Sequence, residues 1–141
     1  MEPATPEPYL IGWKEYVDFP DWPIGRVKAK IDTGARTSVL DVAAYVITEG
    51  IVCMTLILDR KRGRRRHVIA TPLLRFVEVC NTGGALESRP LIQTTIRLGP
   101  VTKRINLTLT DRTDMRFRLL LGRKALEGDF VVDVSRKYLL K

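Results

Sequence analysis

Residues 26–40 read Arg-Val-Lys-Ala-Lys-Ile-Asp-Thr-Gly-Ala-Arg-Thr-Ser-Val-Leu, and this stretch decides the fold. Its first six residues alternate polar and apolar side chains, which predicts a half-buried strand. The strand runs directly into a small polar turn at Asp32, Thr33 and Gly34. Asp accepts hydrogen bonds from the backbone N–H groups that follow it, and Gly lets the chain pass close to a carboxylate. The turn is therefore predicted to present one fixed, partly sheltered carboxylate.

A second segment strengthens this interpretation, because the triplet Asp-Thr-Gly alone is weak evidence and many strands end in such a turn. Far downstream, Leu119, Leu120 and Leu121 form an apolar run that is closed by Gly122 and followed by Arg123. The sequence predicts a short helix over residues 122–126. The chain thus carries a strand with an acidic turn and, later, an apolar run that ends in glycine.

These two segments resemble those of the retropepsin-like aspartic proteases, in which an Asp-Thr-Gly-Ala loop packs on a later apolar-apolar-Gly segment. The chain also resembles a bacterial family within that class, often labelled ATP-dependent zinc proteases and associated with ATP-grasp ligases that add glutamates to a ribosomal protein. The matching stretches are residues 12–15, 28–38, 107–112, 120–123, 130–133 and 138–140. The resemblance implies the same class of peptidase, with a ribosomal protein or an ATP-grasp ligase as a partner.

The rest of the chain reads mainly as short strands. They are predicted over residues 9–19, 43–48, 51–59, 67–71, 74–80, 91–98, 101–110 and 117–121. The class is therefore all-β, and the resemblance implies a closed acid-protease barrel with one short helix near the C-terminus. Residues 1–10 are expected to form a flexible tail rich in Pro and Glu, and residues 11–141 a single domain.

Composition indicates the kind of partner and the compartment. The chain has 24 Lys and Arg against 16 Asp and Glu, and the net charge of +8 favours an anionic partner such as an acidic peptide or RNA. No apolar stretch approaches the roughly 18 residues that cross a bilayer, and the N-terminus does not resemble a secretory signal, so a cytoplasmic protein is expected. Cys53 and Cys80 stand in apolar, strand-like surroundings and are expected to be buried thiols.

One Asp loop cannot run the aspartic-protease reaction, which needs two carboxylates that share a proton. A symmetric homodimer in which two copies of Asp32 meet across a two-fold axis would supply both, as the resemblance also implies. By matched position, Thr33 would hydrogen-bond across the dimer and Gly34 would donate its N–H to the carboxylate. Support from below would come from Leu120, Leu121, Gly122 and Arg123.

A peptide is expected to lie extended across the dimer cleft. Residues 75–90 are the best candidate for a flap, because two strand-like arms flank paired glycines, and an ordinary surface hairpin is the alternative. The predicted substrate-binding residues are Ala35, Arg36, Asn81, Thr82, Gly83 and Gly84. Arg36 near the cleft would favour acidic side chains, so Glu-rich peptides are the expected substrates.

An additional hairpin is expected across residues 51–74. Its tip carries a basic patch formed by Arg60, Lys61, Arg62, Arg64, Arg65 and Arg66. This patch could be a solvated turn, a clamp for acidic peptides or a contact to RNA, because arginine suits carboxylate and phosphate alike. The leading hypothesis is an aspartic-type endopeptidase, and the alternative is a non-catalytic module that binds RNA or an acidic protein through this patch.

Zinc and ATP, which the family label names, find little support in the sequence. His67 is the one histidine, the two cysteines are far apart, and neither an HExxH helix nor a phosphate-binding glycine motif is present. No metal and no cofactor are therefore predicted. Viral retropepsins place an acidic residue after the loop to pair with the later arginine, but this chain has Arg36 there. The candidate partners of Arg123 are Asp41, Asp111 and Asp129, and a surface-exposed arginine without such a partner is the alternative.

Overall fold

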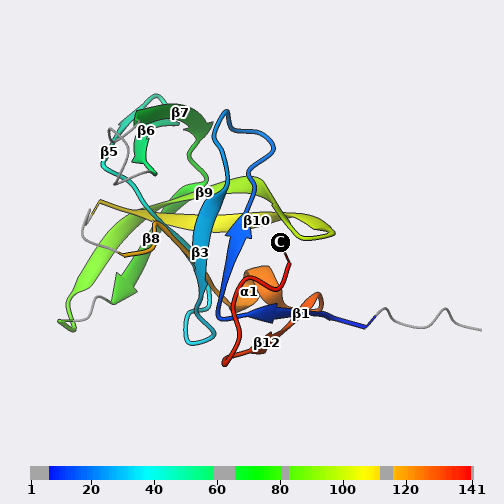
Figure 1. The fold of residues 1–141 in the computed structure, drawn as a ribbon. Coiled ribbons are helices and arrows are strands. Elements are labelled where there is room, and N and C mark those ends of the chain that lie inside the picture. Colours follow the sequence, from blue (N-terminus) through cyan, green and yellow to red (C-terminus); the bar gives the residue numbers. More distant parts are fainter. Residues whose placement is uncertain (1–6, 59–65, 81–82, 112–115, 141) are drawn as a thin grey trace, which may run out of the picture.

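The computed structural model describes residues 7–58, 66–80, 83–111 and 116–140, and over these residues the chain is almost wholly β, as predicted (Figure 1). The strands are β1 (Tyr9–Gly12), β2 (Lys14–Val17), β3 (Val27–Ile31), β4 (Ser38–Asp41), β5 (Ala44–Thr48), β6 (Ile51–Ile57), β7 (Arg66–Pro72), β8 (Arg75–Cys80), β9 (Leu86–Leu98), β10 (Val101–Thr110), β11 (Leu119–Leu121) and β12 (Phe130–Asp133). The described helix is α1 (Arg123–Leu126). In β3 every second residue is buried, which is the alternation that predicted the strand.

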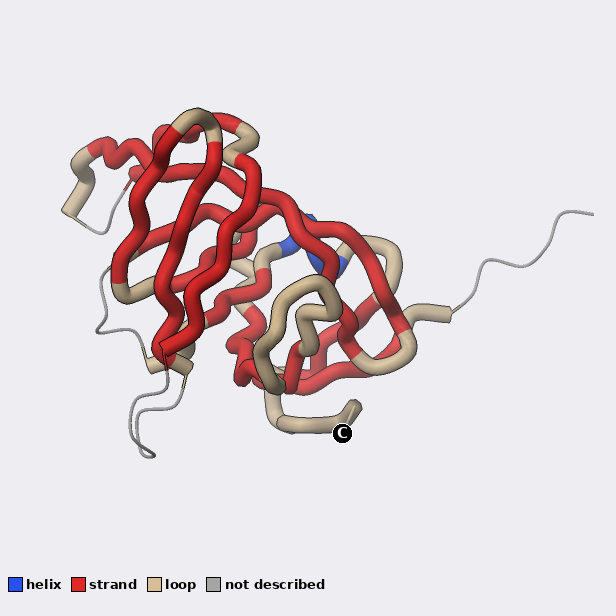
Figure 2. Tube along the Cα trace, turned by 90° about the horizontal axis from the view of Figure 1, so that it is seen from above, coloured by secondary structure: helices blue, strands red, loops and turns tan. Residues whose placement is uncertain are grey.

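The strands form three sheets. Seven strands lie in the order β2-β3-β11-β4-β10-β9-β8, three in the order β5-β6-β7, and β1 pairs with β12. Figures 1 and 2 draw the three-stranded sheet and the β1–β12 pair on opposite sides of the molecule. In the large sheet β11 lies between β3 and β4, parallel to β3 and antiparallel to β4. This arrangement brings the end of β11 against the loop that follows β3.

The prediction of a closed barrel is wrong for the described residues. The seven-stranded sheet curls until the end of β2 approaches β9, but the two strands meet only at a bridge between Asp18 and Arg97. The Asp18 N–H donates to the Arg97 carbonyl oxygen over 3.0 Å, and the Arg97 N–H donates to the Asp18 carbonyl oxygen over 2.8 Å. Pro20, which has no N–H to continue a ladder, follows two residues later. The sheet therefore stays open, because closure needs a continuous ladder.

The core is built from side chains of the two larger sheets. Its fully buried side chains come from the large sheet and from the inner face of the three-stranded sheet, and they include Leu40, Met54, Leu56, Ile92, Ile96, Leu107, Leu109, Leu119 and Leu121. Trp22 belongs to this core and stacks on Phe19 with ring centroids 4.6 Å apart. In the described part of the chain, no helix has the length and apolar character needed to cross a membrane.

The predicted strand over residues 9–19 is two strands in different sheets, separated at Trp13. Tyr9 and Leu10, which the expected tail of residues 1–10 included, belong to β1, whereas residues 1–6 lie outside the described residues. The break allows the C-terminal segment to cross the chain at Gly12, where a Cβ atom would collide with the carbonyl oxygen of Arg136. Only glycine fits this close approach.

The buried carboxylate of Glu15 holds this crossing together. Its Oε2 accepts hydrogen bonds from the N–H groups of Gly12, at 2.7 Å, and Leu139, at 2.9 Å. Its Oε1 accepts another from Leu140 at 3.2 Å. Glu15 is only 1% exposed. One carboxylate therefore ties the start of β2 to the C-terminal segment.

Several local predictions need correction. Cys53 and Cys80 are exposed rather than buried. Cys53 lies on the outer face of β6, between the buried Val52 and Met54. The prediction failed because the apolar sequence of this strand does not require that both faces of its sheet be buried. Strands β4 and β12 were not predicted, and β9 is one continuous strand from Leu86, which joins the second arm of the predicted flap to the strand expected from residue 91.

Candidate active site

The turn after β3 holds the Asp32 carboxylate at the surface. The Asp32 N–H donates to the Leu121 carbonyl oxygen over 2.8 Å, so the strand pairing with β11 extends to the turn. The Gly34 N–H donates to Asp32 Oδ1 over 3.1 Å, and the Ala35 N–H donates to the Asp32 carbonyl oxygen over 3.2 Å. Asp32 is half-buried, whereas Thr33 and Gly34 are exposed. The chain thus presents an oriented carboxylate on an accessible face.

Gly122 packs directly against this loop. A Cβ atom at Gly122 would lie 2.8 Å from the Ala35 carbonyl oxygen and 2.8 Å from the carbonyl carbon of Thr37, closer than real Cβ atoms come. The Gly122 N–H also donates to the buried Ser38 Oγ over 3.0 Å. Because the neighbouring atoms are backbone, they cannot move aside as a side chain would. The Leu-Leu-Gly segment therefore lies in tight contact with the Asp-Thr-Gly loop.

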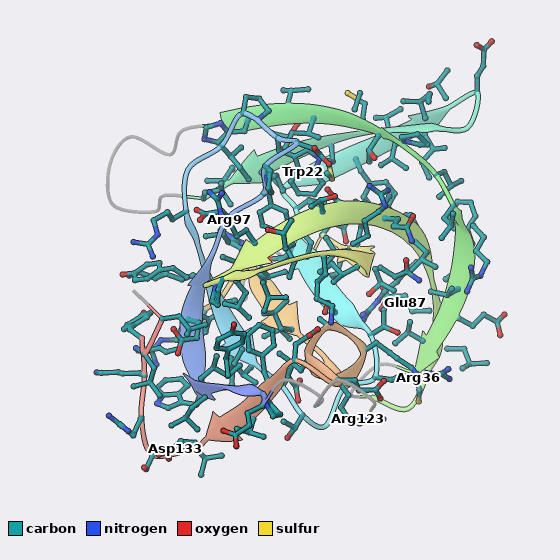
Figure 3. The ribbon with its side chains drawn as sticks, turned by 90° about the vertical axis from the view of Figure 1, so that its right-hand side faces the viewer. Trp22, Arg36, Glu87, Arg97, Arg123 and Asp133 are labelled. Atoms are coloured by element: carbon teal, nitrogen blue, oxygen red, sulfur yellow. The ribbon has the colours of Figure 1, made fainter. Side chains whose placement is uncertain are left out.

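Arg123 contacts the loop through main-chain groups. Its N–H donates to the Ala35 carbonyl oxygen over 2.8 Å, and its Nη1 donates to the Thr33 carbonyl oxygen over 3.0 Å. Two of the candidate partners of Arg123 form ion pairs with other cations. Asp41 pairs with Arg118 and Asp129 pairs with Lys103, both at 2.7 Å. Arg36 is exposed, and Figure 3 draws it with Arg123 beside α1.

Sequence reasoning missed a cationic strip on the face of β3 that carries Asp32. Lys28 and Lys30 are exposed at alternate positions, and Asp32 continues the same alternation. Lys14 on β2 is paired with Lys30. Partial burial, followed by the charges of Lys137, Arg116 and Lys28, lowers the pKa of the Lys14 ammonium group. The signal was present in the sequence, because Lys-x-Lys-x-Asp places all three side chains on one face of a strand.

The predicted flap hairpin is formed by β8 and the first part of β9, which pair antiparallel up to Cys80 and Leu86. Gly83 and Gly84 are exposed at its tip, and Gly84 has a φ of +85°, a conformation that favours glycine. Asn81 and Thr82 lie outside the described residues. Figure 3 draws Glu87, near the start of β9, on the same side of the molecule as Arg36.

The predicted basic patch falls almost wholly outside the described residues, which include only Arg66 of its six members. Strands β6 and β7 pair up to Ile57 and Arg66, so the extra hairpin is present and Arg66 is exposed at the start of β7. In the described part of the chain, no group of three or more His, Cys, Asp or Glu side chains is arranged to hold a metal ion.

An Asp-Thr-Gly turn at the end of a strand, packed on a Leu-Leu-Gly segment that leads into a short helix, is the arrangement of a retropepsin-like protein. Comparison with known families agrees with this class. The chain belongs to the RimB-like family, described as the retropepsin-like aspartic endopeptidase RimB, whose model matches residues 10–141.

Two relatives named "Probable alpha-L-glutamate ligase" are similar over most of this chain. The protein of Shewanella halifaxensis (strain HAW-EB4) is 29% identical over 136 residues, which are 94% of this chain and 30% of the relative. That of Parasynechococcus marenigrum (strain WH8102) is 34% identical over 134 residues, which are 88% of this chain and 28% of the relative. The chain therefore spans less than a third of the length of these relatives.

A solved structure has the same fold. The crystal structure of a protein of unknown function from Legionella pneumophila subsp. pneumophila str. Philadelphia 1 superimposes with a TM-score of 0.76 at 22% sequence identity. The similarity covers 94% of this chain and 98% of that one. At this level of identity the match concerns the fold alone.

Proposed function

We propose that this protein is an aspartic-type endopeptidase that acts as a homodimer. One observation carries the proposal: the half-buried carboxylate of Asp32 stands on an accessible turn, oriented by the Gly34 N–H and braced by Gly122 and Arg123. A carboxylate turned into the core could not meet a second copy, whereas this one lies beside the exposed Thr33 and Gly34. Membership of a family described as aspartic endopeptidases supports the same chemistry.

In the proposed reaction, the two Asp32 carboxyl groups share one proton and hold a water molecule between them. The ionised carboxylate accepts a proton from the water, whose oxygen attacks the peptide carbonyl carbon. The protonated carboxyl group gives its proton to the carbonyl oxygen, which produces a tetrahedral diol. As the diol collapses and the C–N bond breaks, the carboxyl group that took the proton from water gives it to the leaving nitrogen. The other carboxylate accepts a proton from a diol hydroxyl, which restores the dyad with one shared proton. The second copy supplies the second carboxyl group that one chain lacks.

We propose acidic, Glu-rich peptides as the substrates. Lys30 is exposed on the strand face that leads to Asp32, Arg36 is exposed on the loop that follows it, and the whole chain carries a net charge of +8. These cations would attract carboxylate side chains. The relatives named alpha-L-glutamate ligases would form, by that name, bonds to glutamate. Association with such a ligase or with a ribosomal protein, in the cytoplasm, is part of the proposal.

The direct test uses the purified protein and a pair of labelled peptides, one Glu-rich and the other with Gln at the same positions. We expect cleavage of the Glu-rich peptide, and Asp32→Asn should reduce the rate by at least about a hundredfold, because removing a general acid–base group costs this much or more. Asp21→Asn is the matched control, since Asp21 is exposed in the turn before β3. Undiminished turnover by Asp32→Asn would refute the proposal.

Two further measurements separate the competing functions. A metallopeptidase would lose its activity when a chelator removes the metal, whereas we expect this protein to keep its activity. A binding module would retain steeply salt-dependent binding of RNA or of an acidic protein in Asp32→Asn, and would lose it when Arg64, Arg65 and Arg66 become Ala. Sedimentation of the protein with and without the peptide would reveal whether the dimer forms.

A further inference from the structure

The cationic strip leads along β3 to Asp32 and is open to solvent. Lys28 and Lys30 are exposed at alternate positions of β3, and the half-buried Asp32 is the next residue on the same face. Lys14 on β2 lies directly opposite Lys30, and the half-buried Tyr16 lies opposite Lys28. All of these pairs belong to the β2–β3 ladder, so the strip is one continuous surface beside the turn.

The strip places like charges together at a cost to the fold. Side chains directly opposite each other across antiparallel strands have Cβ atoms about 4.5–5.5 Å apart, and like charges there are destabilising. Lys14 and Lys30 are such a pair. Partial burial is the largest cause that lowers the pKa of the Lys14 ammonium group. The charges of Lys137, Arg116 and Lys28 lower this pKa further. Folding alone gives no reason for this arrangement, whereas binding of an anion does.

No carboxylate among the described residues neutralises the strip. The ion pairs within the described part of the chain involve other cations. Glu15 of β2 is buried on the opposite face, where it accepts backbone N–H groups. Asp18, just beyond β2, pairs with Arg97 at 3.7 Å. The positive charge of the strip is therefore left for an anion from outside, and the carboxylate that follows the strip on β3 is that of Asp32.

Aromatic rings hold the Lys14 ammonium group in place. Its Nζ lies 4.8 Å from the ring centroid of Trp13 and 5.2 Å from that of Tyr138. The ring of Phe117 lies 6.0 Å away. Tyr138 is fixed in turn, because it stacks on Tyr16 with centroids 4.6 Å apart and its N–H donates to the Lys14 carbonyl oxygen over 2.9 Å. A cation held over ring faces loses less freedom on binding an anion than a free lysine does.

The spacing of the strip matches that of an extended acidic peptide. Residues two apart in a strand lie about 6.6 Å apart on one face, and this interval separates Lys28 from Lys30 and Lys30 from Asp32. Alternate side chains of an extended peptide repeat at the same interval. A run of glutamates that leads away from the cut bond along β3 would meet Lys30, with Lys14 beside it, and then Lys28. A single glutamate would use only part of the strip.

We propose that Lys14, Lys28 and Lys30 form an extended binding site for a run of acidic side chains on one side of the bond that is cut. The proposal rests on the proposed peptidase function and deepens it, because the length of the acidic run becomes the feature that the protein selects. RNA is a different polyanion. The strip ends at Asp32, where a peptide is held for cleavage, and this continuity favours the peptide.

The test measures binding in the Asp32→Asn protein, so that it does not depend on cleavage. Fluorescein-labelled peptides of one length carry Gln throughout, or Glu in place of one, two, three or four successive Gln, and fluorescence anisotropy gives each Kd at one ionic strength. We expect the affinity to rise about tenfold from one Glu to four. Lys28→Gln and Lys30→Gln should each weaken binding of the four-Glu peptide by about threefold to fivefold and leave the Gln peptide unchanged.

Arg104→Gln is the matched control, because Arg104 is an exposed cation of β10 whose loss changes the net charge equally. Weakening no greater than in Arg104→Gln, or an affinity that does not depend on the number of Glu residues, would overturn the site. So would tighter binding of a ten-nucleotide oligouridylate that the same lysine substitutions abolish, because the strip would then be an RNA-binding surface.

Urea unfolding separates binding from a structural role. Lys30→Gln removes one of two opposed cations, so its midpoint should stay the same or rise. A lower midpoint together with an unchanged dependence on the number of Glu residues would overturn the site. If the unsubstituted protein cleaves the Glu-rich peptide but binding ignores the number of Glu residues, the peptidase function stands and the site is refuted. Graded binding without cleavage would support the site and refute the peptidase function.

Discussion

Replacing Glu15 by Ala should be among the most damaging single substitutions outside the active-site loop. The Glu15 carboxylate accepts three backbone hydrogen bonds, from Gly12, Leu139 and Leu140, at 2.7, 2.9 and 3.2 Å. Alanine removes the acceptor and leaves three N–H groups behind. The segment that crosses Gly12 then loses its attachment to β2.

The magnitude follows from these bonds. A buried donor without a partner costs about 1–3 kcal/mol, and the Leu139 and Leu140 groups are only partly buried, so water can replace part of what they lose. We therefore expect Glu15→Ala to lower the free energy of unfolding by about 3–5 kcal/mol. A domain of this size has about 5–15 kcal/mol in total, and the midpoint of thermal unfolding should fall by roughly 10–17 °C.

Urea unfolding followed by tryptophan fluorescence measures this change, since Trp13 follows Gly12 in the sequence and Trp22 belongs to the core. Glu78→Ala is the control, because Glu78 is exposed on β8 and its loss should change stability by less than about 0.5 kcal/mol. A loss below about 1 kcal/mol in Glu15→Ala would refute the reasoning, because the carboxylate would then not hold the crossing.

Three other outcomes are expected. Gly122→Ala should cost about 1–3 kcal/mol in urea unfolding, because its Cβ would meet backbone atoms of the active-site loop, and an unchanged midpoint would contradict that packing. The Ser135 hydroxyl and N–H lower the pKa of the Asp133 carboxyl group in the folded protein. The ionised carboxylate therefore stabilises the fold above the pKa that Asp133 has in the unfolded chain, and this stabilisation is lost as the pH falls through the lower pKa of the folded state. Ser135→Ala should move that pKa upward in an NMR titration, and no movement would contradict the assignment. Cys53 and Cys80 should both react with a thiol reagent in the native protein, and protection of either would contradict their exposure.

The sequence alone determined the parts of this protein that depend on neighbouring residues. Alternation over residues 26–31 predicts β3, and the turn at Asp32 follows from the chemistry of Asp and Gly. The all-β class and the Leu-Leu-Gly segment were also visible in the sequence. So was the position of Lys30 and Asp32 on the same face of the strand, although this was overlooked. These features are local, because side-chain periodicity and turn geometry are set within a few residues.

Only the tertiary structure decided the features that join distant segments. The sheet stays open at Asp18 and Arg97, and Arg123 contacts the Thr33 carbonyl oxygen, a partner that the sequence did not suggest. The contact between the Leu-Leu-Gly segment and the Asp-Thr-Gly loop exists because β11 pairs with β3 and β4, which are far from it in the chain, in one particular register. A shift of a single residue would turn each side chain to the opposite face, and local sequence patterns do not encode that choice between strands.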